Sequence, residues 1–275
     1  MRGEASLSAD RESRDSLAPR LKGAGADTWR IGEDLFVVTN LLDHDVQVER
    51  SLTDPSRPSA DKVALVKAIV GSQAHPITVE ILSDLVSRKW SKVGDIANAT
   101  EDFAVDAMMY YADSTDATLE VSTQLAQIHS ALLEMSVLRS ELSDGYASAQ
   151  ARVDLLRKAL AGTELNKVTM RLTEHAAANP RRRRFLQTVQ WLIGKFSRHM
   201  GQSMVTVTTA TPLNEAQTQK LASHFGKQVG RPVHINSVVD ASVLGGMRVQ
   251  IGDDVTDNTV AAQLEQLHRS VREHV

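Results

Sequence analysis

The chain has 275 residues, enough for one large domain or two ordinary ones, with 42% hydrophobic and 24% charged side chains. This is the composition of a globular protein, and the formal net charge of −3 excludes a strong electrostatic attraction to nucleic acid or to a membrane surface. The absence of cysteine excludes disulfides, thiolate metal sites and cysteine nucleophiles.

The beginning of the chain has no apolar stretch typical of a secretory signal, and no run of about 18 apolar residues predicts a transmembrane helix. If the protein works at a membrane, a partner must hold it there. Aromatic residues make up only 4% of the chain, so the core must consist mainly of Leu, Val, Ile and Ala, which favours helices.

Apolar side chains recur at helical spacing up to about residue 200, with short polar breaks between them. We expect helices over 29–42, 63–70, 77–86 and 95–113. A turn is expected over 53–59, because two prolines interrupt any helix there.

The second part of this helical region resembles the first when the sequence is shifted by 90 positions. The shift carries Leu52 onto Leu142 together with the turn that follows, and it pairs Leu35 with Leu125. Matched apolar positions alone could arise by chance in two helical segments. Because the turns match as well, the sequence predicts one small helical bundle that has been duplicated.

The composition changes near residue 203, where a β-branched run predicts a strand over 205–209. Thr211 as N-cap and Pro212 in the first turn predict a helix that ends near Gly226. Two more strands, over 232–239 and 243–251, and a last helix from about Asp257 are expected to follow.

The predicted fold is mainly α, with a duplicated N-terminal helical bundle followed by a small α/β domain of the order β-α-β-β-α. The expected domains are 1–94, 95–202 and 203–275, with the helix over 95–113 available to both bundles.

Motifs of catalysis and nucleotide binding are missing from the sequence. There is no Walker A loop, no G-x-G-x-x-G after a strand, no G-x-S-x-G and no pair of histidines at metal-ligand spacing. Gly245 and Gly246 lie in a strand pattern, where close backbone packing is favoured over a phosphate site. We therefore expect no catalytic residue, metal or cofactor, and an interaction protein rather than an enzyme, although active sites need not leave a local motif.

Two charged clusters leave alternatives open. Asp253, Asp254 and Asp257 could hold Mg²⁺, but their place between a strand and a helix favours capping of the helix. A basic cluster precedes another predicted helix and consists of Arg181, Arg182, Arg183 and Arg184. A solvated face is the leading interpretation, ahead of an acidic protein partner, lipid headgroups and nucleic acid.

The end of the sequence resembles the ATP synthase delta subunit family, whose mitochondrial members are called oligomycin-sensitivity-conferring proteins. The residues that carry the resemblance are Leu244, Gly245, Gly246, Arg248, Gly252, Asp253, Asp257, Leu264 and Leu267. The segment 205–213 is similar to the opening of the same domain. The length and the duplication resemble the long delta subunits of actinobacteria, whereas the usual bacterial subunit has one bundle.

The resemblance implies a non-catalytic stator subunit on the cytoplasmic face of the bacterial plasma membrane, peripheral and held there by the complex. Its bundle would hold N-terminal helices of the alpha subunits, and its C-terminal domain would hold the b-type peripheral stalk. A generic helical adaptor explains the helices without the motif, and an enzyme with a non-local site explains neither.

The resemblance also implies grooves for alpha-subunit helices. Candidates in the first bundle are Ile81, Leu82 and Leu85, on a helix beside the N-terminal helix. Candidates in the second are Val168 and Leu172, beside the helix of Phe103 and Tyr110. The alternative for each residue is the internal core. Duplication offers two grooves, so one chain could hold two alpha helices.

Overall fold

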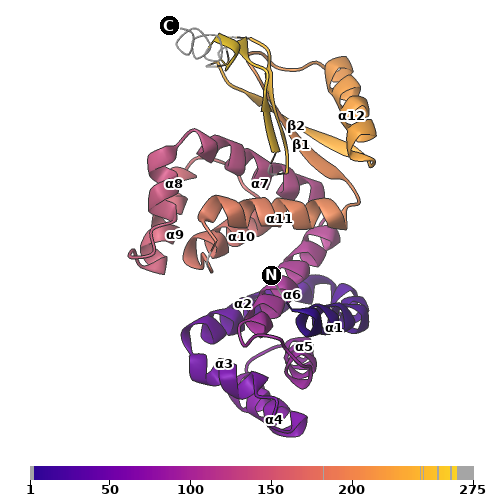
Figure 1. The fold of residues 1–275 in the computed structure, drawn as a ribbon, viewed down its shortest axis with the longest axis vertical. Coiled ribbons are helices and arrows are strands. Elements are labelled where there is room, and N and C mark those ends of the chain that lie inside the picture. Colours follow the sequence, from indigo (N-terminus) through magenta and orange to yellow (C-terminus); the bar gives the residue numbers. More distant parts are fainter. Residues whose placement is uncertain are drawn as a thin grey trace, which may run out of the picture. The chain divides into compact units, whose positions relative to one another are not determined.

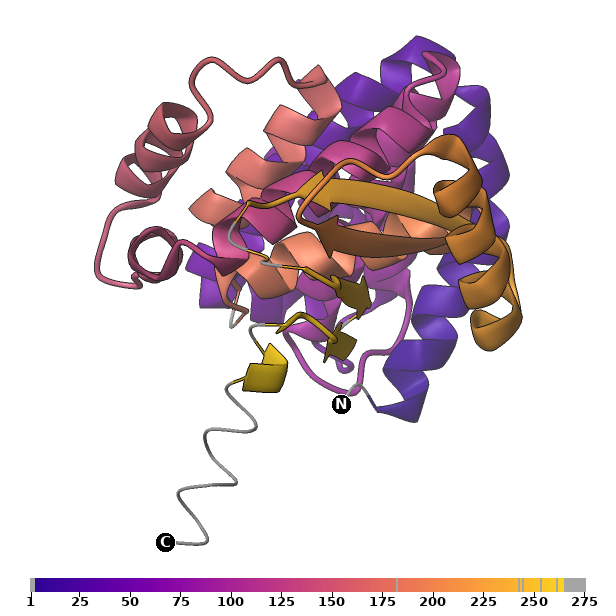
Figure 2. The same cartoon turned by 90° about the horizontal axis from the view of Figure 1, so that it is seen from above.

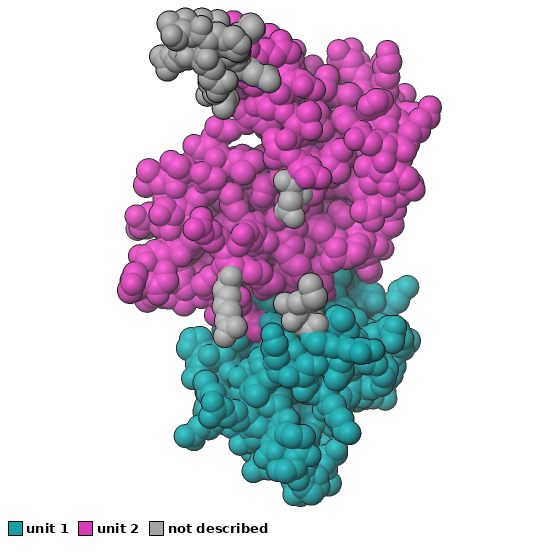
Figure 3. Space-filling model, in the orientation of Figure 1, with its two compact units in different colours: residues 1–117 teal, residues 118–275 magenta. Residues whose placement is uncertain are grey.

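The computed structural model describes residues 3–181, 183–241, 243, 245–252, 254–260 and 262–264. It divides into two compact units, Met1–Ala117 and Thr118–Val275 (Figure 3). The first unit is helical, and the second combines helices with a sheet. The expected mainly α fold with a small α/β part at the end is confirmed.

The first unit is a bundle in which α2 and α6 form the most extensive helix pair, while α1 packs against α5 and α6 (Figure 1). Its apolar core includes Ile31, Leu35 and Phe36 of α2, which are buried. Its elements are α1 (Glu4–Gly23), the short 3₁₀ helix Gly25–Asp27, α2 (Thr28–His44), α3 (Val46–Thr53), α4 (Ser59–Val70), α5 (Pro76–Ser87) and α6 (Asp95–Ser114).

The helical part of the second unit pairs α7 with α11 and packs α10 against α9, α11 and α7. Phe185, Leu192 and Phe196 of α11 are buried in its core. Its helices are α7 (Thr118–Leu133), α8 (Ser136–Leu142), α9 (Ala149–Ala159), α10 (Lys167–Ala178) and α11 (Phe185–His199).

The helix starts of the two parts repeat with the period that the sequence indicates. The helices α2, α3, α4 and α6 each begin 90 positions before α7, α8, α9 and α11, whereas α10 begins one residue later than this shift requires. The duplication of the bundle is therefore confirmed, with one extra residue before α10.

The rest of the second unit is a four-stranded sheet of order β2-β1-β3-β4. Its strands are β1 (Ser203–Thr209), β2 (Val233–Val239), β3 (Met247–Ile251) and β4 (Asp254–Asp257), with α12 (Glu215–Val229) between the first two. β1 runs parallel to β2 and antiparallel to β3. Val205, Val207, Ile235 and Val249 form an apolar core with Phe225 of α12.

Figure 2 shows α12 along one side of β1 and β2. Because side chains alternate along a strand, the residues between those of the apolar core face the opposite side of the sheet. That side is polar, with Thr206, Asn236 and Gln250, and it faces α7 and α11 of the same unit.

Several predicted boundaries in the sheet region are wrong. α12 begins at Glu215, not near Thr211, because Asn214 caps it by accepting from Gln217 N. It runs past Gly226 to Val229 and ends at Gly230, whose φ of 74° is the left-handed conformation that favours glycine. β3 begins at Met247 rather than Val243, and β4 was not expected.

Candidate partner-binding surfaces

The groove candidates of the first bundle lie on α5 with their side chains in the apolar core of the first unit. Ile81 and Leu85 are 0% exposed and Leu82 is 4% exposed. α1 packs over this helix and over α6. A partner helix at this place would therefore first meet the polar side chains that flank these residues.

The groove candidates of the second bundle fall in both units. Val168 and Leu172 are buried on α10 in the second unit, whereas Phe103 and Tyr110 lie on α6 in the first. The guanidinium of Arg14 lies 5.4 Å from the centre of the Phe103 ring. Burial, with the nearby carboxylates Asp106 and Asp113, raises the pKa of Tyr110 above its usual value.

An ion cluster centred on Arg14 fixes α1 to α6. Arg14 hydrogen-bonds to Asp106, and its guanidinium lies 3.6 Å from Asp102 and 3.3 Å from Asp10. Burial alone would lower the pKa of Arg14, but these carboxylates raise it above its usual value. The sequence analysis missed this cluster, because Arg14 is about 90 residues from Asp102 and Asp106, and helical spacing does not connect positions on different helices.

The duplicated bundles share a polar anchor, at the start of α5 in the first and at the start of α10 in the second. The sequence analysis also missed this anchor. Asp34 Oδ2 accepts from the His75 backbone N at 2.7 Å and from the Thr78 hydroxyl at 3.1 Å. In the second unit Gln124 Oε1 accepts from Asn166 N at 2.9 Å and from the Thr169 hydroxyl at 2.7 Å. The anchor satisfies a backbone donor at the helix start and ties that end to α2 or α7.

A buried arginine closes the other end of α10. Arg152 of α9 donates to the backbone oxygens of Ala177, Ala178 and Asp144 at 2.7, 2.9 and 2.8 Å. The carbonyls at a helix C-terminus lack N–H donors within the helix, and this guanidinium supplies the missing donors. The matching position in the first bundle, Lys62, is also a buried cation.

The glycine pair of the family motif packs closely against the chain after β4. Gly246 has a φ of 79°, and a Cβ there would lie 2.4 Å from Asn258 O. Gly245 O accepts from Val260 N at 3.0 Å. This is the close backbone packing that the sequence favours over a phosphate site.

The other described motif residues lie on or near the last two strands. Arg248 donates to Asp257 at 3.2 Å, and Gly252, with a φ of 62°, lies between β3 and β4. Burial would raise the pKa of Asp257, but its hydrogen bonds with Thr259 and Arg248 lower it below its usual value. Three motif positions lie outside the described residues: Leu244, Asp253 and Leu267.

The described residues of the acidic cluster, Asp254 and Asp257, take part in local structure. Asp257 Oδ1 accepts from Thr259 N at 3.0 Å, and Thr259 Oγ1 in turn accepts from Ala262 N at 3.2 Å. Asp254 belongs to β4. Among the described residues, no three His, Asp or Glu side chains gather to hold a metal ion.

The basic cluster covers the turn before α11. Arg181 has a φ of 42°, Arg183 stacks 4.4 Å from the centre of the Trp191 ring, and Arg184 N donates to Gln187 Oε1 at 3.0 Å. Arg182 lies outside the described residues. The described arginines therefore help to shape the turn as well as carrying charge.

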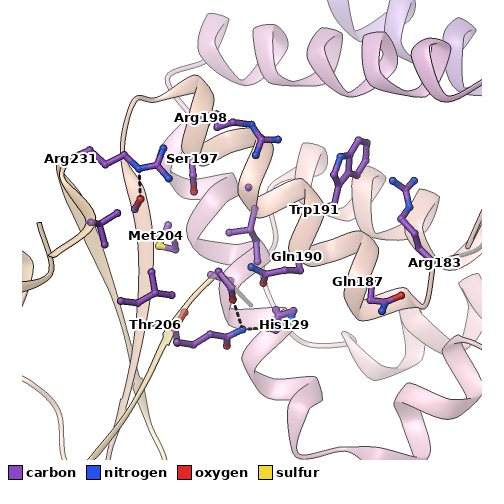
Figure 4. A pocket seen from close by; sticks show the side chains of 18 residues that line it. His129, Arg183, Gln187, Gln190, Trp191, Ser197, Arg198, Met204, Thr206 and Arg231 are labelled. Carbon is purple, nitrogen blue, oxygen red and sulfur yellow. Dashed lines mark hydrogen bonds between the residues drawn. The ribbon is translucent and has the colours of Figure 1, made fainter. Parts of the chain in front are cut away.

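A cavity of about 660 Å³ lies between α7, α11 and the polar side of the sheet (Figure 4). Figure 4 shows Arg198 and Arg231 near Ser197 at one end, and Arg183 with Trp191 at the other. Gln250 contacts His129 at 3.5 Å, and Arg248 donates to Glu134 at 2.6 Å. The sheet is thus tied to α7 by polar contacts, beside a cavity with a cationic lining.

No helix in the described ranges is both long enough and apolar enough to cross a membrane.

Comparisons with known proteins agree with the resemblance at the end of the sequence. A family model described as ATP synthase delta (OSCP) subunit matches residues 105–271. A protein named ATP synthase subunit delta from Bifidobacterium longum (strain DJO10A) is 64% identical over 99% of this chain and 98% of its own length. One of the same name from Kineococcus radiotolerans is 32% identical over 97% of this chain and 95% of its own. The chain therefore belongs to the ATP synthase delta (OSCP) subunit family, in its long actinobacterial form.

Proposed function

We propose that this chain, a non-catalytic stator subunit of ATP synthase, ties the catalytic head to the b-type peripheral stalk and keeps the head from turning with the rotor. The observation that carries the proposal is the similarity over nearly its full length to proteins named ATP synthase subunit delta. The work needs long-lived contacts rather than chemistry, which fits a chain without a catalytic motif.

The head contact in this proposal is helix-in-groove binding of an alpha-subunit N-terminal helix. The surfaces concerned are those around Ile81, Leu82 and Leu85 on α5, around Val168 and Leu172 on α10, and around Phe103 and Tyr110 on α6. Because most of these side chains are buried, they would support the groove from below while their neighbours touch the partner.

The stalk contact in this proposal uses the sheet and the residues after it. Val255, Val260 and Leu264 expose apolar side chains there, with Leu264 50% exposed. A contiguous exposed apolar patch favours a protein partner, and these three side chains are the candidates for one in this proposal. In this proposal the complex holds the chain peripherally at the cytoplasmic face of the membrane through these two contacts.

The domain limits of this proposal are 1–94, 95–202 and 203–275, with α6 serving both bundles. The sequence period supports the shared helix. A shift of 90 positions carries the start of α2, Thr28, onto the start of α7, Thr118. The same shift carries α1 onto α6 to within one residue, and both helices have 20 residues. The helix α6 would therefore play the part in the second bundle that α1 plays in the first.

Titration calorimetry tests the proposal with two ligands. One is a synthetic peptide of the alpha subunit's N-terminal helix, and the other is the C-terminal segment of the b-type subunit. Submicromolar binding of both, at separate sites, is expected. A generic helical adaptor would bind neither, and that result with a folded chain would reject the proposal.

A further inference from the structure

The cavity between α7, α11 and the sheet is lined by a polar face of α11. This face carries Gln187, Gln190, Gly194 and Ser197, which are three or four positions apart and therefore lie on one side of the helix. The polar side of the sheet forms the facing wall. The cavity volume of about 660 Å³ is within the range of about 300–1,000 Å³ typical of small-molecule sites, and its polar walls suit a polar ligand.

Two arginines lie at the end of the cavity where α11 leads into the sheet. Figure 4 shows Arg198 and Arg231 near Ser197. Arg231 Nε donates to the Ser203 hydroxyl at 2.6 Å, which fixes the guanidinium and leaves its two Nη groups for other acceptors. The guanidinium of Arg198 lies back along α11, since a Cβ on Gly194 would be 3.4 Å from Arg198 Nη1.

Backbone hydrogen bonds bring the residues of this end together. Gln202 N donates to Ser197 O at 3.0 Å, which folds the turn after α11 back onto the last turn of the helix. Ser203 N donates to Pro232 O at 2.9 Å, which joins the start of β1 to the segment of Arg231. The side chains of two segments about 30 residues apart therefore meet at one end of the cavity.

The two arginines have no acidic counterpart in the cavity. None of the described lining residues is Asp or Glu, and no salt bridge joins Arg198 or Arg231 to a carboxylate in the described part of the chain. Glu134 lines a neighbouring hollow and is paired with Arg248. Because like charges at one end of a cavity repel each other, a bound anion would lower the electrostatic free energy there.

A buried hydroxyl lies at the same place. Ser197 is 6% exposed, and its Oγ forms no hydrogen bond with any residue that the structure describes. Buried polar side chains normally have a hydrogen-bond partner, so this hydroxyl is available to a ligand in the cavity. Water would satisfy the hydroxyl, but it would not neutralise the two guanidinium groups.

We propose that Arg198, Arg231 and Ser197 form a binding site for the phosphate group of a small soluble molecule. A phosphate group presents several acceptor oxygens and a charge of about −2, and guanidinium groups bind it through paired N–H···O bonds. Arg183 lies at the other end of the cavity (Figure 4), so the site suits a molecule with a second anionic group. This inference goes beyond the proposed function and does not depend on it.

Titration calorimetry of the full chain with pyrophosphate tests the site, because this probe consists of two linked phosphate groups and nothing else. At a constant ionic strength of about 0.15 M, we expect one site per chain with a Kd below about 1 mM. Replacing pyrophosphate by sodium chloride at the same ionic strength should give no such binding.

Matched variants separate a built site from a general attraction of charge. Arg231→Gln should raise the Kd about tenfold or more, whereas Arg157→Gln, which removes the same charge from an exposed position on α9, should leave it within about twofold. Arg198→Lys keeps the charge but loses the planar fork, and Ser197→Ala removes the hydroxyl. Each should raise the Kd about threefold or more. Circular dichroism checks that all four variants are folded.

Two results would overturn the inference. One is equal weakening in Arg231→Gln and Arg157→Gln, which would show attraction by overall charge alone. The other is no binding of pyrophosphate by the folded chain, even if a glutamate-rich peptide binds, since the cavity would then take an acidic protein segment instead. Neither result changes the titrations with the alpha and b-type peptides, so this inference and the proposed function can fail separately.

Discussion

Single polar side chains fix the ends of the helices in both bundles. Asp34 and Gln124 hold the starts of α5 and α10, and Arg152 holds the end of α10. Each satisfies backbone groups that a helix terminus leaves without partners. Sequence periodicity could not find them, because a polar residue on a helix looks the same whether it faces solvent or a neighbouring helix end.

Replacing the buried arginine by an apolar residue of similar length should destabilise the second unit. In Arg152→Met the carbonyls of Ala177 and Ala178 lose their partner, at a cost of about 2–4 kcal/mol. Urea unfolding, followed by the fluorescence of Trp191 in a background where Trp29 and Trp90 are replaced by Phe, measures this loss in the free energy of unfolding.

Arg157→Met is the matched control, since the ion pair of Arg157 with Glu174 lies at the surface, where solvent screens it, and should contribute little to stability. Equal losses of stability in the two variants would contradict the role given to Arg152.

The histidine on β2 makes the second unit sensitive to mild acid. Burial lowers the pKa of His234 below its usual value of about 6.5, so below that pH the unfolded chain takes up a proton more readily than the folded one. The free energy of unfolding should therefore fall as the pH decreases through this range. In His234→Gln the fall should be smaller; identical pH profiles of the two proteins would contradict the assignment.

At the scale of elements, α1 is held mainly by polar contacts. Its buried face includes Ser6, Ala9 and Ser13, with Leu17 and Leu21 only toward its end. Such a face gains little from the hydrophobic effect, so the ion cluster of Arg14 carries much of the attachment.

Arg14→Leu should loosen α1 without unfolding the rest of the first unit. The change leaves Asp102 and Asp106 without this cation, at a cost of about 2 kcal/mol. Hydrogen exchange should then be about tenfold faster or more in α1 amides and nearly unchanged in α2. Arg11→Leu, on the exposed side of α1, is the control, and similar exchange in both variants would reject the assignment.

The sequence was sufficient to predict which segments are helices, but it predicted only some of the residues at which the helices begin and end. The expected helix over 95–113 is α6 almost residue for residue, because its apolar and small residues repeat without interruption. The start of α12 was misplaced because Thr211 and Pro212 resemble a cap, whereas Asn214 makes the capping hydrogen bonds. β4 has an acidic, exposed sequence, and only its pairing with β3 makes it a strand.

At the scale of the whole molecule, duplication could be predicted because it leaves matched turns as well as matched apolar positions. The polar contacts that join α1 to α5 and α6 could not be predicted, since the residues they connect are about 60 to 90 positions apart in the sequence. The groove candidates are apolar residues at helical spacing, and this spacing marks core positions as readily as binding surfaces.

The most direct test of the stator function is reconstitution. Membrane vesicles from a bacterium whose delta subunit has been deleted should regain proton-driven ATP synthesis when this chain is added, while the isolated chain hydrolyses no ATP. Restored synthesis, measured as ATP formed per unit time under an imposed proton gradient, is the predicted result. Vesicles that stay uncoupled, with the folded chain added and all other subunits present, would contradict the proposed function.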